Sequence, residues 1–342
     1  MPDSRNHQRE RRRVTMRDVA VRAGVGTITV SRAIADPSKV SSALRERIDA
    51  AIVELGYVPN RMAGGLSSQR SRVVPVIVPA IRNAVFADLV DGVNTVLLDA
   101  GYQILLGATD YDPAREESLI ADLLGWTPEG IIVVGTDHTE AATRMLRATE
   151  ATVVELFELD RDPIDINIGF SNTEAAGAMT DYLVDKGYRR IVFVGAFMEQ
   201  DRRADQRRAG FEARLVKRGI SDGQTLKYPV KSSYELGAQA LHEVRERWPE
   251  ADAIFFANDV LAVGALLEAN RIGLAVPNDI AVAGFNGLEI GARMTPDLTT
   301  VASPRFEMGQ RAADAILKRH GVARPDPYTV DISYTVLARA SA

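Results

Sequence analysis

The first residues that could do chemistry are the hydroxyl and cationic side chains near the start of the chain, within Thr27–Arg32. An arginine such as Arg32 can make a bidentate hydrogen bond to guanine, and Thr27 and Ile28 can contact a thymine methyl group. Hydroxyl groups suit phosphate oxygens, contacts that position a protein on DNA without reading its sequence. The candidates for these contacts are Thr15, Thr29 and Ser31.

A second group of polar side chains follows apolar segments later in the chain. These side chains lie in Pro79–Phe86, Thr109–Asp112, Gly195–Arg208, Asn258-Asp259 and Phe285-Asn286. If the apolar segments are parallel strands, a ligand site is expected outside their carboxyl ends. The acids among them, Asp110, Asp112 and Asp259, could serve an enzyme, but such carboxylates commonly bind hydroxyl groups without chemistry.

The first group requires short helices to position it. Thr15 and Asp18 have the spacing of a capping box, and Gly24 is placed to end that helix in a left-handed conformation. A second helix is predicted from about Thr27 to Ala35, and a third from Ser41 or Ser42 to Leu55. Three helices with a glycine-containing turn between the first two are typical of a helix-turn-helix.

From residue 73 the pattern changes to strands that alternate with amphipathic helices. Strands are predicted at Val73–Val78, Tyr102–Gly107, Gly130–Val134, Thr152–Leu156, Ile191–Gly195, Ala253–Ala257 and Ile280–Gly284. Helices are predicted at Phe86–Ala100, Pro113–Trp126 and Asp201–Lys217. Nearly continuous apolar strands separated by helices indicate an α/β fold with parallel sheets covered on both faces. This length favours two similar subdomains.

Charge and composition narrow the function classes. The net charge of −5 is the sum of +7 over residues 1–72 and −12 over the remainder, which suggests that the first part meets a polyanion. The chain has no cysteine, so it has no disulfide and no cysteine zinc site. The four histidines show no ligand spacing, and no apolar run reaches the roughly 18 residues of a membrane helix. No cofactor and no metal are predicted, and a cytoplasmic location is expected.

Several motifs together resemble the DNA-binding head of the lactose/galactose-repressor (LacI/GalR) family. They are Val14–Ala20, Ala23–Val25, Thr29–Arg32 and Leu55–Asn60, and the resemblance continues through Ala257–Asp259 and Ala283–Phe285. Within the family, the gluconate-utilisation repressors are most similar, on Asn83–Asp88, His138-Thr139, Gly169–Asn172, Ser232–Tyr234 and Pro304-Arg305. The resemblance implies a body like that of periplasmic sugar-binding proteins.

The resemblance also implies an order of domains. A basic disordered arm is expected over 1–13, the helix-turn-helix over 14–59, a hinge helix and linker over 60–72, and the effector-binding and dimerisation domain over 73–342. Asn60 and Leu66 then belong to the DNA-contacting hinge, where Leu66 would enter the minor groove as a wedge. Gly26 stands where the family usually has serine, which removes a hydroxyl group at the start of the reading helix.

The family implies an effector site in the body. Its expected residues are Val85, Phe86, Glu174, Arg207, Ser232, Asn258, Asn286 and Arg305. Asn286 stands where many sugar-binding relatives carry an aspartate, and a neutral amide does not repel a carboxylate, so Arg207 could bind one with two hydrogen bonds. For Arg305 the alternative is an ion pair at the subdomain seam. For Glu174 the alternative is an acidic residue at the start of a helix, where the helix dipole favours a negative charge.

These observations predict a ligand-controlled transcriptional repressor rather than an enzyme. A gluconate-like sugar acid is favoured as effector, and a neutral sugar or a sugar phosphate stays open. A palindromic operator and a homodimer are expected, with a tetramer left open and the surfaces Phe86–Ala100 and Ser232–Arg247 as candidate interfaces. A solute-binding protein of the same two-lobed fold would not carry residues 14–68, and the chain has neither a Walker A nor a G-x-S-x-G motif.

Overall fold

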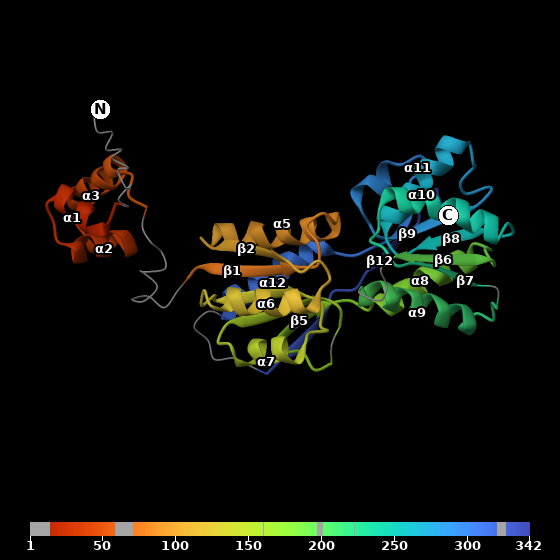
Figure 1. Cartoon of the computed structure of the whole chain (residues 1–342), viewed down its shortest axis with the longest axis horizontal. Helices are drawn as coiled ribbons and strands as arrows, with labels where there is room; N and C mark the ends of the chain where they lie inside the picture. Colours follow the sequence, from red (N-terminus) through yellow and green to blue (C-terminus); the bar gives the residue numbers. More distant parts are fainter. Residues whose placement is uncertain (1–13, 59–70, 160, 197–200, 222, 320–325) are drawn as a thin grey trace, which may run out of the picture. The chain divides into compact units, whose positions relative to one another are not determined.

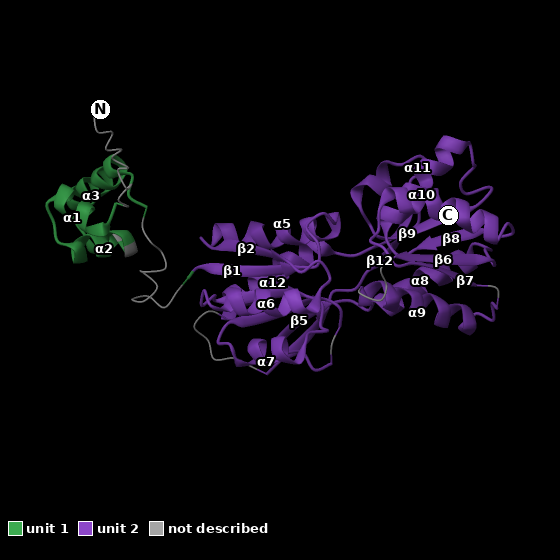
Figure 2. Cartoon of the chain, in the orientation of Figure 1, with its two compact units in different colours: residues 1–71 green, residues 72–342 purple. Residues whose placement is uncertain are grey.

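The computed structural model describes residues 14–58, 71–159, 161–196, 201–221, 223–319 and 326–342. The chain divides into two compact units, residues 1–71 and 72–342 (Figure 2). The predicted arm over 1–13 and the hinge residues Asn60 and Leu66 lie outside the described residues. No helix within the described ranges is both long and apolar enough to span a bilayer.

The first unit is a three-helix head. Its elements are α1 (Met16–Ala23), α2 (Thr27–Ala35), a 3₁₀ turn η1 (Pro37–Lys39) and α3 (Ser42–Leu55). The capping box predicted for α1 is present, because the Thr15 side chain accepts from the Asp18 backbone and the Asp18 side chain accepts from the Thr15 backbone. Gly24 ends α1 with φ 64°, the left-handed conformation expected for it. Its core is formed by Val19, Ala20, Ala23, Val30, Ala33, Ile48, Ala51 and Tyr57.

The second unit contains two six-stranded sheets, each the centre of one lobe (Figure 1). The first-lobe sheet has the order β11-β5-β4-β3-β1-β2, and all its pairings are parallel. Its strands are β1 (Val73–Val78), β2 (Gln103–Ala108), β3 (Gly130–Val134), β4 (Thr152–Phe157), β5 (Ile166–Gly169) and β11 (Tyr328–Asp331). The second-lobe sheet has the order β12-β10-β9-β8-β6-β7 and is parallel except for the β10–β12 pair. Its strands are β6 (Ile191–Ala196), β7 (Gln224–Tyr228), β8 (Ala253–Phe256), β9 (Ala281–Asn286), β10 (Thr299–Ala302) and β12 (Thr335–Leu337).

Helices cover both sheets. The first lobe has α5 (Ala84–Asp99), α6 (Pro113–Leu124), α7 (Glu140–Ala148) and α12 (Arg305–Arg319). The second lobe has α8 (Asn172–Asp185), α9 (Arg202–Lys217), α10 (Tyr234–Arg247), α11 (Asp259–Ile272) and the 3₁₀ helix η2 (Glu289–Arg293). The chain passes between the lobes after β5, after β10 and between β11 and β12, so α12 returns to the first lobe and packs on α5.

Close packing of α12 on α5 depends on two glycines. A Cβ atom at Gly92 would overlap the backbone of Phe306, and one at Gly309 would overlap the backbone of Leu89. Because neither glycine carries a side chain, the two helices approach at backbone distance. This contact fixes α12, and therefore Arg305 at its first turn, against α5.

Each of the seven predicted strands is present, with ends displaced by at most two residues. Sequence reasoning missed β5, β7 and β10. β5 and β10 are only four residues long, and β7 lies at the edge of its sheet with one buried side chain, Leu226, so it lacks a continuous apolar run. The end of the chain, expected to form strands and loop, contains β11 and β12.

Candidate functional site

Helix α2 presents the predicted DNA-reading residues on one exposed side. Val30 and Ala33 are buried on the side that packs on the rest of the head, whereas Thr27, Ser31 and Arg32 are exposed and Ile28 is 69% exposed. An isoleucine so exposed has no packing role in the free head, and no carboxylate among the described residues pairs with Arg32. Both features leave these side chains available for DNA.

Two hydroxyl candidates for phosphate contacts differ in their surroundings. The Thr15 hydroxyl donates to Asp18 Oδ2 at 2.7 Å, so it already has a partner in the capping box. Thr29 is half-buried. Gly26 is the N-cap residue of α2 and supplies no side-chain hydrogen bond, as its replacement of serine implies.

The turn before α2 is held by contacts from α3. Arg47 Nη2 donates to the Ala23 carbonyl at 2.6 Å, and Arg22 pairs with Glu54 across α1 and α3, with Nε 2.9 Å from Oε1. The reading helix is therefore presented on a fixed scaffold.

In the body, Arg207 is a buried guanidinium with neutral partners. Its side chain on α9 is 5% exposed, Nε donates to Asn172 Oδ1 at 2.9 Å and Nη1 donates to the Ala257 carbonyl at 2.8 Å. The guanidinium lies 3.9 Å from the centre of the Phe285 ring. No carboxylate among the described residues pairs with it, and burial lowers its pKa to about 10. The group is still charged at neutral pH.

Asn286 forms a strained corner at the end of β9. Its φ is 114°, a left-handed conformation that is costly for a residue with a side chain. Its carbonyl accepts from Arg305 Nη1, and its buried amide oxygen Oδ1 has no hydrogen-bond partner among the described residues. A buried acceptor without a donor is uncommon and points to a missing partner.

Asn258 and Ser232 are brought together as predicted for one site. Asn258 follows β8 and is the N-cap of α11, where its Oδ1 accepts from the Leu261 amide at 3.1 Å. Its Nδ2 donates to Ser232 Oγ at 2.7 Å.

For Arg305 and Glu174 the structure favours the alternatives to an effector contact. Arg305 bridges the lobes, because Nη2 donates to Asp88 Oδ2 of α5 at 2.6 Å while Nη1 donates to the Asn286 carbonyl. Glu174 lies in the first turn of α8 and its carboxylate pairs with Arg214 at 3.0 Å. Both side chains therefore have partners from other elements, and a ligand contact for them stays a prediction.

Asp259 and Asp110 likewise have structural partners. Asp259 is fully buried, where it accepts from Thr300 Oγ1 and the Leu288 amide, each at 2.6 Å, and burial raises its pKa. Asp110 at the end of β2 pairs with Lys231 of the second lobe.

The first-lobe wall of the cleft contains residues that sequence reasoning did not assign. Val85 and Phe86 of α5 are buried there, and the Arg203 guanidinium, which reaches this wall from α9 of the second lobe, lies over the rings of Phe86 and Phe157 at 5.7 and 5.9 Å. A cavity of about 230 Å³ adjoins this point, lined by Pro79, Thr109, Tyr111, Asp112, Pro113, Glu116, Val134, Gly135, Asp137, Glu158, Arg202 and Arg203. Arg203 precedes Arg207 by four residues on α9, so helical spacing could have found it.

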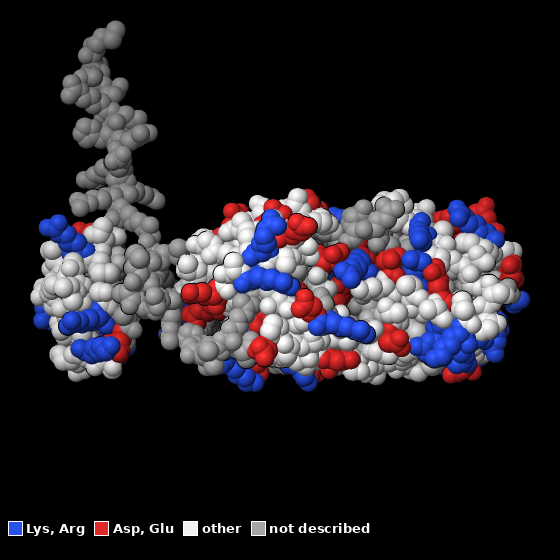
Figure 3. All heavy atoms as spheres, turned by 90° about the horizontal axis from the view of Figure 1, so that it is seen from below, with Lys and Arg blue, Asp and Glu red and all other residues white. Residues whose placement is uncertain are grey.

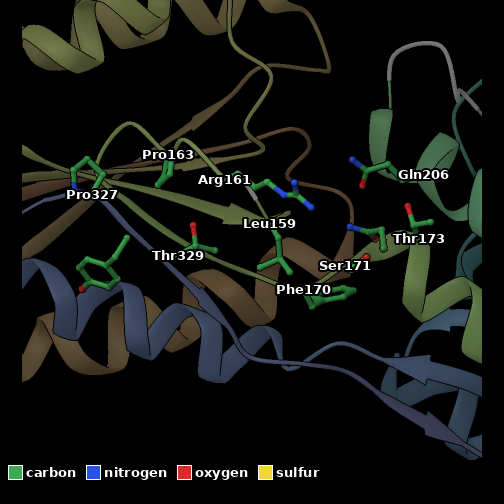
Figure 4. Close-up of a pocket in the computed structure, with 11 residues that line it drawn as sticks. Leu159, Arg161, Pro163, Phe170, Ser171, Thr173, Gln206, Pro327 and Thr329 are labelled. Carbon is green, nitrogen blue, oxygen red and sulfur yellow. The ribbon is translucent and has the colours of Figure 1, made fainter.

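A larger cavity of about 680 Å³ lies along the β5–β11 edge (Figure 4). Arg161 extends across it toward the side where Ser171 and Gln206 lie. None of the eight predicted effector residues lines it. Size alone therefore does not identify the effector site, and the buried charge of Arg207 is the better guide.

Comparison with known proteins places this geometry in a family. Residues 15–60 match the family "Bacterial regulatory proteins, lacI family", and residues 180–342 match a periplasmic binding protein-like domain. The chain is 37% identical to the HTH-type transcriptional regulator GntR of Escherichia coli K12 over 96% of this chain and 98% of that one. It belongs to the LacI family.

Other LacI-family proteins are similar over the whole chain. The transcriptional regulator IdnR of Escherichia coli K12 is 34% identical over 97% of this chain and 98% of its own length. The crystal structure of a LacI-family regulator from Silicibacter pomeroyi superimposes with a TM-score of 0.90 at 36% identity, over 96% of this chain and 99% of that one. LacI-family proteins are DNA-binding repressors, not enzymes, and typically bind operator DNA and small-molecule effectors as dimers. The head and the two-lobed body described above are the parts this activity requires.

The distribution of charge on the body agrees with this division of labour. On the face in Figure 3, acidic and basic side chains of the second unit are interspersed. On α8 and α9, for example, Arg214 pairs with Asp181 and Glu174, and Arg218 with Asp181 and Asp185. Such a surface offers no stripe of one sign for a DNA backbone to follow.

Proposed function

We propose that this repressor controls sugar-acid utilisation genes and that its effector is a gluconate-like sugar acid bound between the lobes, with its carboxylate at Arg207. The observation that carries the proposal is the buried Arg207 guanidinium, whose hydrogen-bond partners are both neutral and which has no carboxylate of the described residues within ion-pair distance. A buried charge is costly unless an opposite charge meets it, and a ligand carboxylate supplies one. Nη2 has no hydrogen bond within the described part of the chain, which leaves a donor for that carboxylate.

The polyol part of such a ligand matches the remaining groups. The unpartnered Oδ1 of Asn286 accepts a ligand hydroxyl, which satisfies a buried acceptor. Ser232 Oγ, which already accepts from Asn258, can donate to another hydroxyl. Glu174 does not oppose the carboxylate, since Arg214 neutralises it on the α8–α9 surface.

On the DNA side, we assign base reading to Thr27, Ile28 and Arg32 and phosphate contacts to Thr15, Thr29 and Ser31. Exposure of the α2 face supports this assignment. Asn60 and Leu66 remain assigned to the hinge contact on the resemblance alone.

The second copy in the dimer is proposed to cover the α5–β2 face of the first lobe. An apolar cavity of about 450 Å³ lies there, lined by Val78, Ile81, Phe86, Ala87, Val90, Asp91, Asn94, Ile104 and Leu106. Ile81 is 62% exposed, and an apolar groove of this kind is commonly covered by a partner. Of the two candidate interfaces, Phe86–Ala100 is therefore favoured.

Calorimetric titration of the full chain tests the effector. Gluconate, glucose and glucose 6-phosphate are titrated into the protein, Arg207→Gln and the control Arg208→Gln, whose arginine pairs with Asp205 and Glu212 on the same helix. Gluconate is expected to bind, and Arg207→Gln to weaken it about 10- to 100-fold, because a hydrogen bond between charged groups is lost. Binding of the neutral sugar alone, or equal effects of the two variants, would refute the proposal.

A further inference from the structure

We infer that the first-lobe wall of the cleft selects effectors with a single anionic group. The inference rests on the proposed function and concerns the end of the ligand away from Arg207. That end is expected to be a hydroxyl-bearing tail at Glu158, and sugar acids with a second carboxylate or a phosphate there are excluded.

Arg207 lies one helical turn beyond Arg203, which lines the wall, on the same helix α9. The cavity of about 230 Å³ is lined by residues that follow first-lobe strands, among them Thr109, Tyr111 and Glu158, and by Arg203 of α9. A ligand that is held at Arg207 and reaches past Arg203 into this cavity meets Tyr111 and Glu158.

Most charges of the wall have partners. Arg202 lies 3.5 Å from Asp137, and Glu116 lies 2.6 Å from His138. Asp112 caps α6 by accepting from the Ala114 amide at 2.9 Å. Each of these charged groups already has an ion-pair or hydrogen-bond partner within the protein.

Glu158 is the exception in this wall. It is 4% exposed, and its Oε2 accepts from Thr136 Oγ1 at 3.1 Å, which is a neutral donor. The nearby Arg203 already has Asp201 at 3.2 Å, and Asp201 also acts on Arg207, so no guanidinium among the described residues serves Glu158 alone. A hydroxyl can donate to Glu158, whereas a second ligand anion meets a buried like charge.

The two ends of the cleft therefore differ in charge. Arg207 of the second lobe has only neutral hydrogen-bond partners, and the buried carboxylate of Glu158, directly after β4 of the first lobe, accepts from the neutral Thr136 hydroxyl. A six-carbon acid with one carboxylate and a terminal hydroxyl satisfies both ends. An aldaric acid of the same length satisfies only one.

The test compares gluconate, glucarate and 6-phosphogluconate by calorimetric titration of the full chain. The wild-type protein is expected to bind gluconate about tenfold or more tightly than either dianion, because like charges in a buried site repel. Glu158→Gln keeps the size of the side chain and removes its charge, so it should bring the gluconate-to-glucarate ratio close to one, chiefly by tightening glucarate. Glu158→Asp keeps the charge and should retain the discrimination.

Glu140→Gln is the matched control, since that carboxylate of the first lobe is exposed on α7 and paired with Arg144, and it should leave the ratio unchanged. Equal binding of gluconate and glucarate by the wild type would overturn the inference and leave the sugar-acid effector standing. So would an unchanged ratio in a folded Glu158→Gln protein, and Glu158→Asp decides the case if Glu158→Gln does not fold. Binding of neither acid would remove the proposed effector and, with it, this inference.

Discussion

The stability of the first lobe should fall at alkaline pH because of one buried histidine. The His138 side chain is 2% exposed, with Nδ1 2.6 Å from Glu116 Oε1 and Nε2 3.6 Å from Glu155 Oε1. Burial lowers its pKa, but the hydrogen bond to Glu116 and the nearby charges of Glu116 and Glu155 outweigh burial and raise the pKa to about 9, from 6.5 in the unfolded chain. The folded state therefore binds the proton more tightly than the unfolded state.

The sign and the pH window follow from that difference. A raised folded-state pKa contributes stability that is fully present below about pH 6.5 and is lost as the pH rises through about 9. The shift corresponds to about 3 kcal/mol of unfolding free energy as an order of magnitude. Denaturant unfolding of wild type and His138→Gln at pH 6, 7.5 and 9.5 measures it.

The wild type should lose about that amount over this range, and His138→Gln should lose much less. The difference between the two proteins is the relevant quantity, since other groups titrate in both. Parallel pH dependence of the two unfolding free energies would refute the reasoning, because His138 would then not be the protonated group.

Two further predictions concern DNA binding and assembly. Arg32→Met should cost about 1–3 kcal/mol of operator binding and relax specificity at one base pair, whereas Thr29→Val should weaken binding to all sequences alike. Fluorescence anisotropy with an operator selected from random DNA, and with its single-base variants, distinguishes the two effects. A uniform loss of affinity for Arg32→Met would contradict its base-reading role. Ile81→Glu should shift the protein toward monomer in sedimentation and weaken operator binding in anisotropy measurements, because burying a charge in the apolar α5–β2 face is costly. The control Val216→Glu, on α9 and 79% exposed, should change neither result.

The head was predictable from sequence because its signals are local. The Thr15–Asp18 capping box, the left-handed Gly24 and the apolar spacing of α3 each act within a few residues, and each fixes an element boundary. Arg207, Asn258 and Asn286 were assigned from motifs that carry the family resemblance. The resemblance could place them near a ligand, but it could not give their partners.

The first-lobe wall could not be assigned because it is assembled from distant segments. Tyr111 follows β2, and Glu158 begins the β4–β5 connection. Arg203 comes from α9 of the second lobe, so the order of the first-lobe sheet and the contact between the lobes are both needed to bring the three together. The ion-pair partners of Glu174 and Arg305 could not be predicted for a similar reason. Their partners Arg214 and Asp88 lie 40 and 217 residues away in sequence, and no local pattern indicates such ion pairs.

Arg305 gives the cleft a physical connection between its two sides. The same guanidinium donates to the carbonyl of Asn286 and to Asp88 on α5 of the first lobe. The side-chain Oδ1 of Asn286 is buried and has no hydrogen-bond partner among the described residues. Arg305 also holds the strained backbone of Asn286. A ligand hydroxyl that binds Asn286 Oδ1 therefore contacts the residue through which Arg305 connects the two lobes. An effector shifts the repressor between two states only if it binds one of them more tightly. In this arrangement of the lobes Asn286 Oδ1 is an unsatisfied acceptor, so a ligand hydroxyl at Asn286 can produce such a difference in affinity.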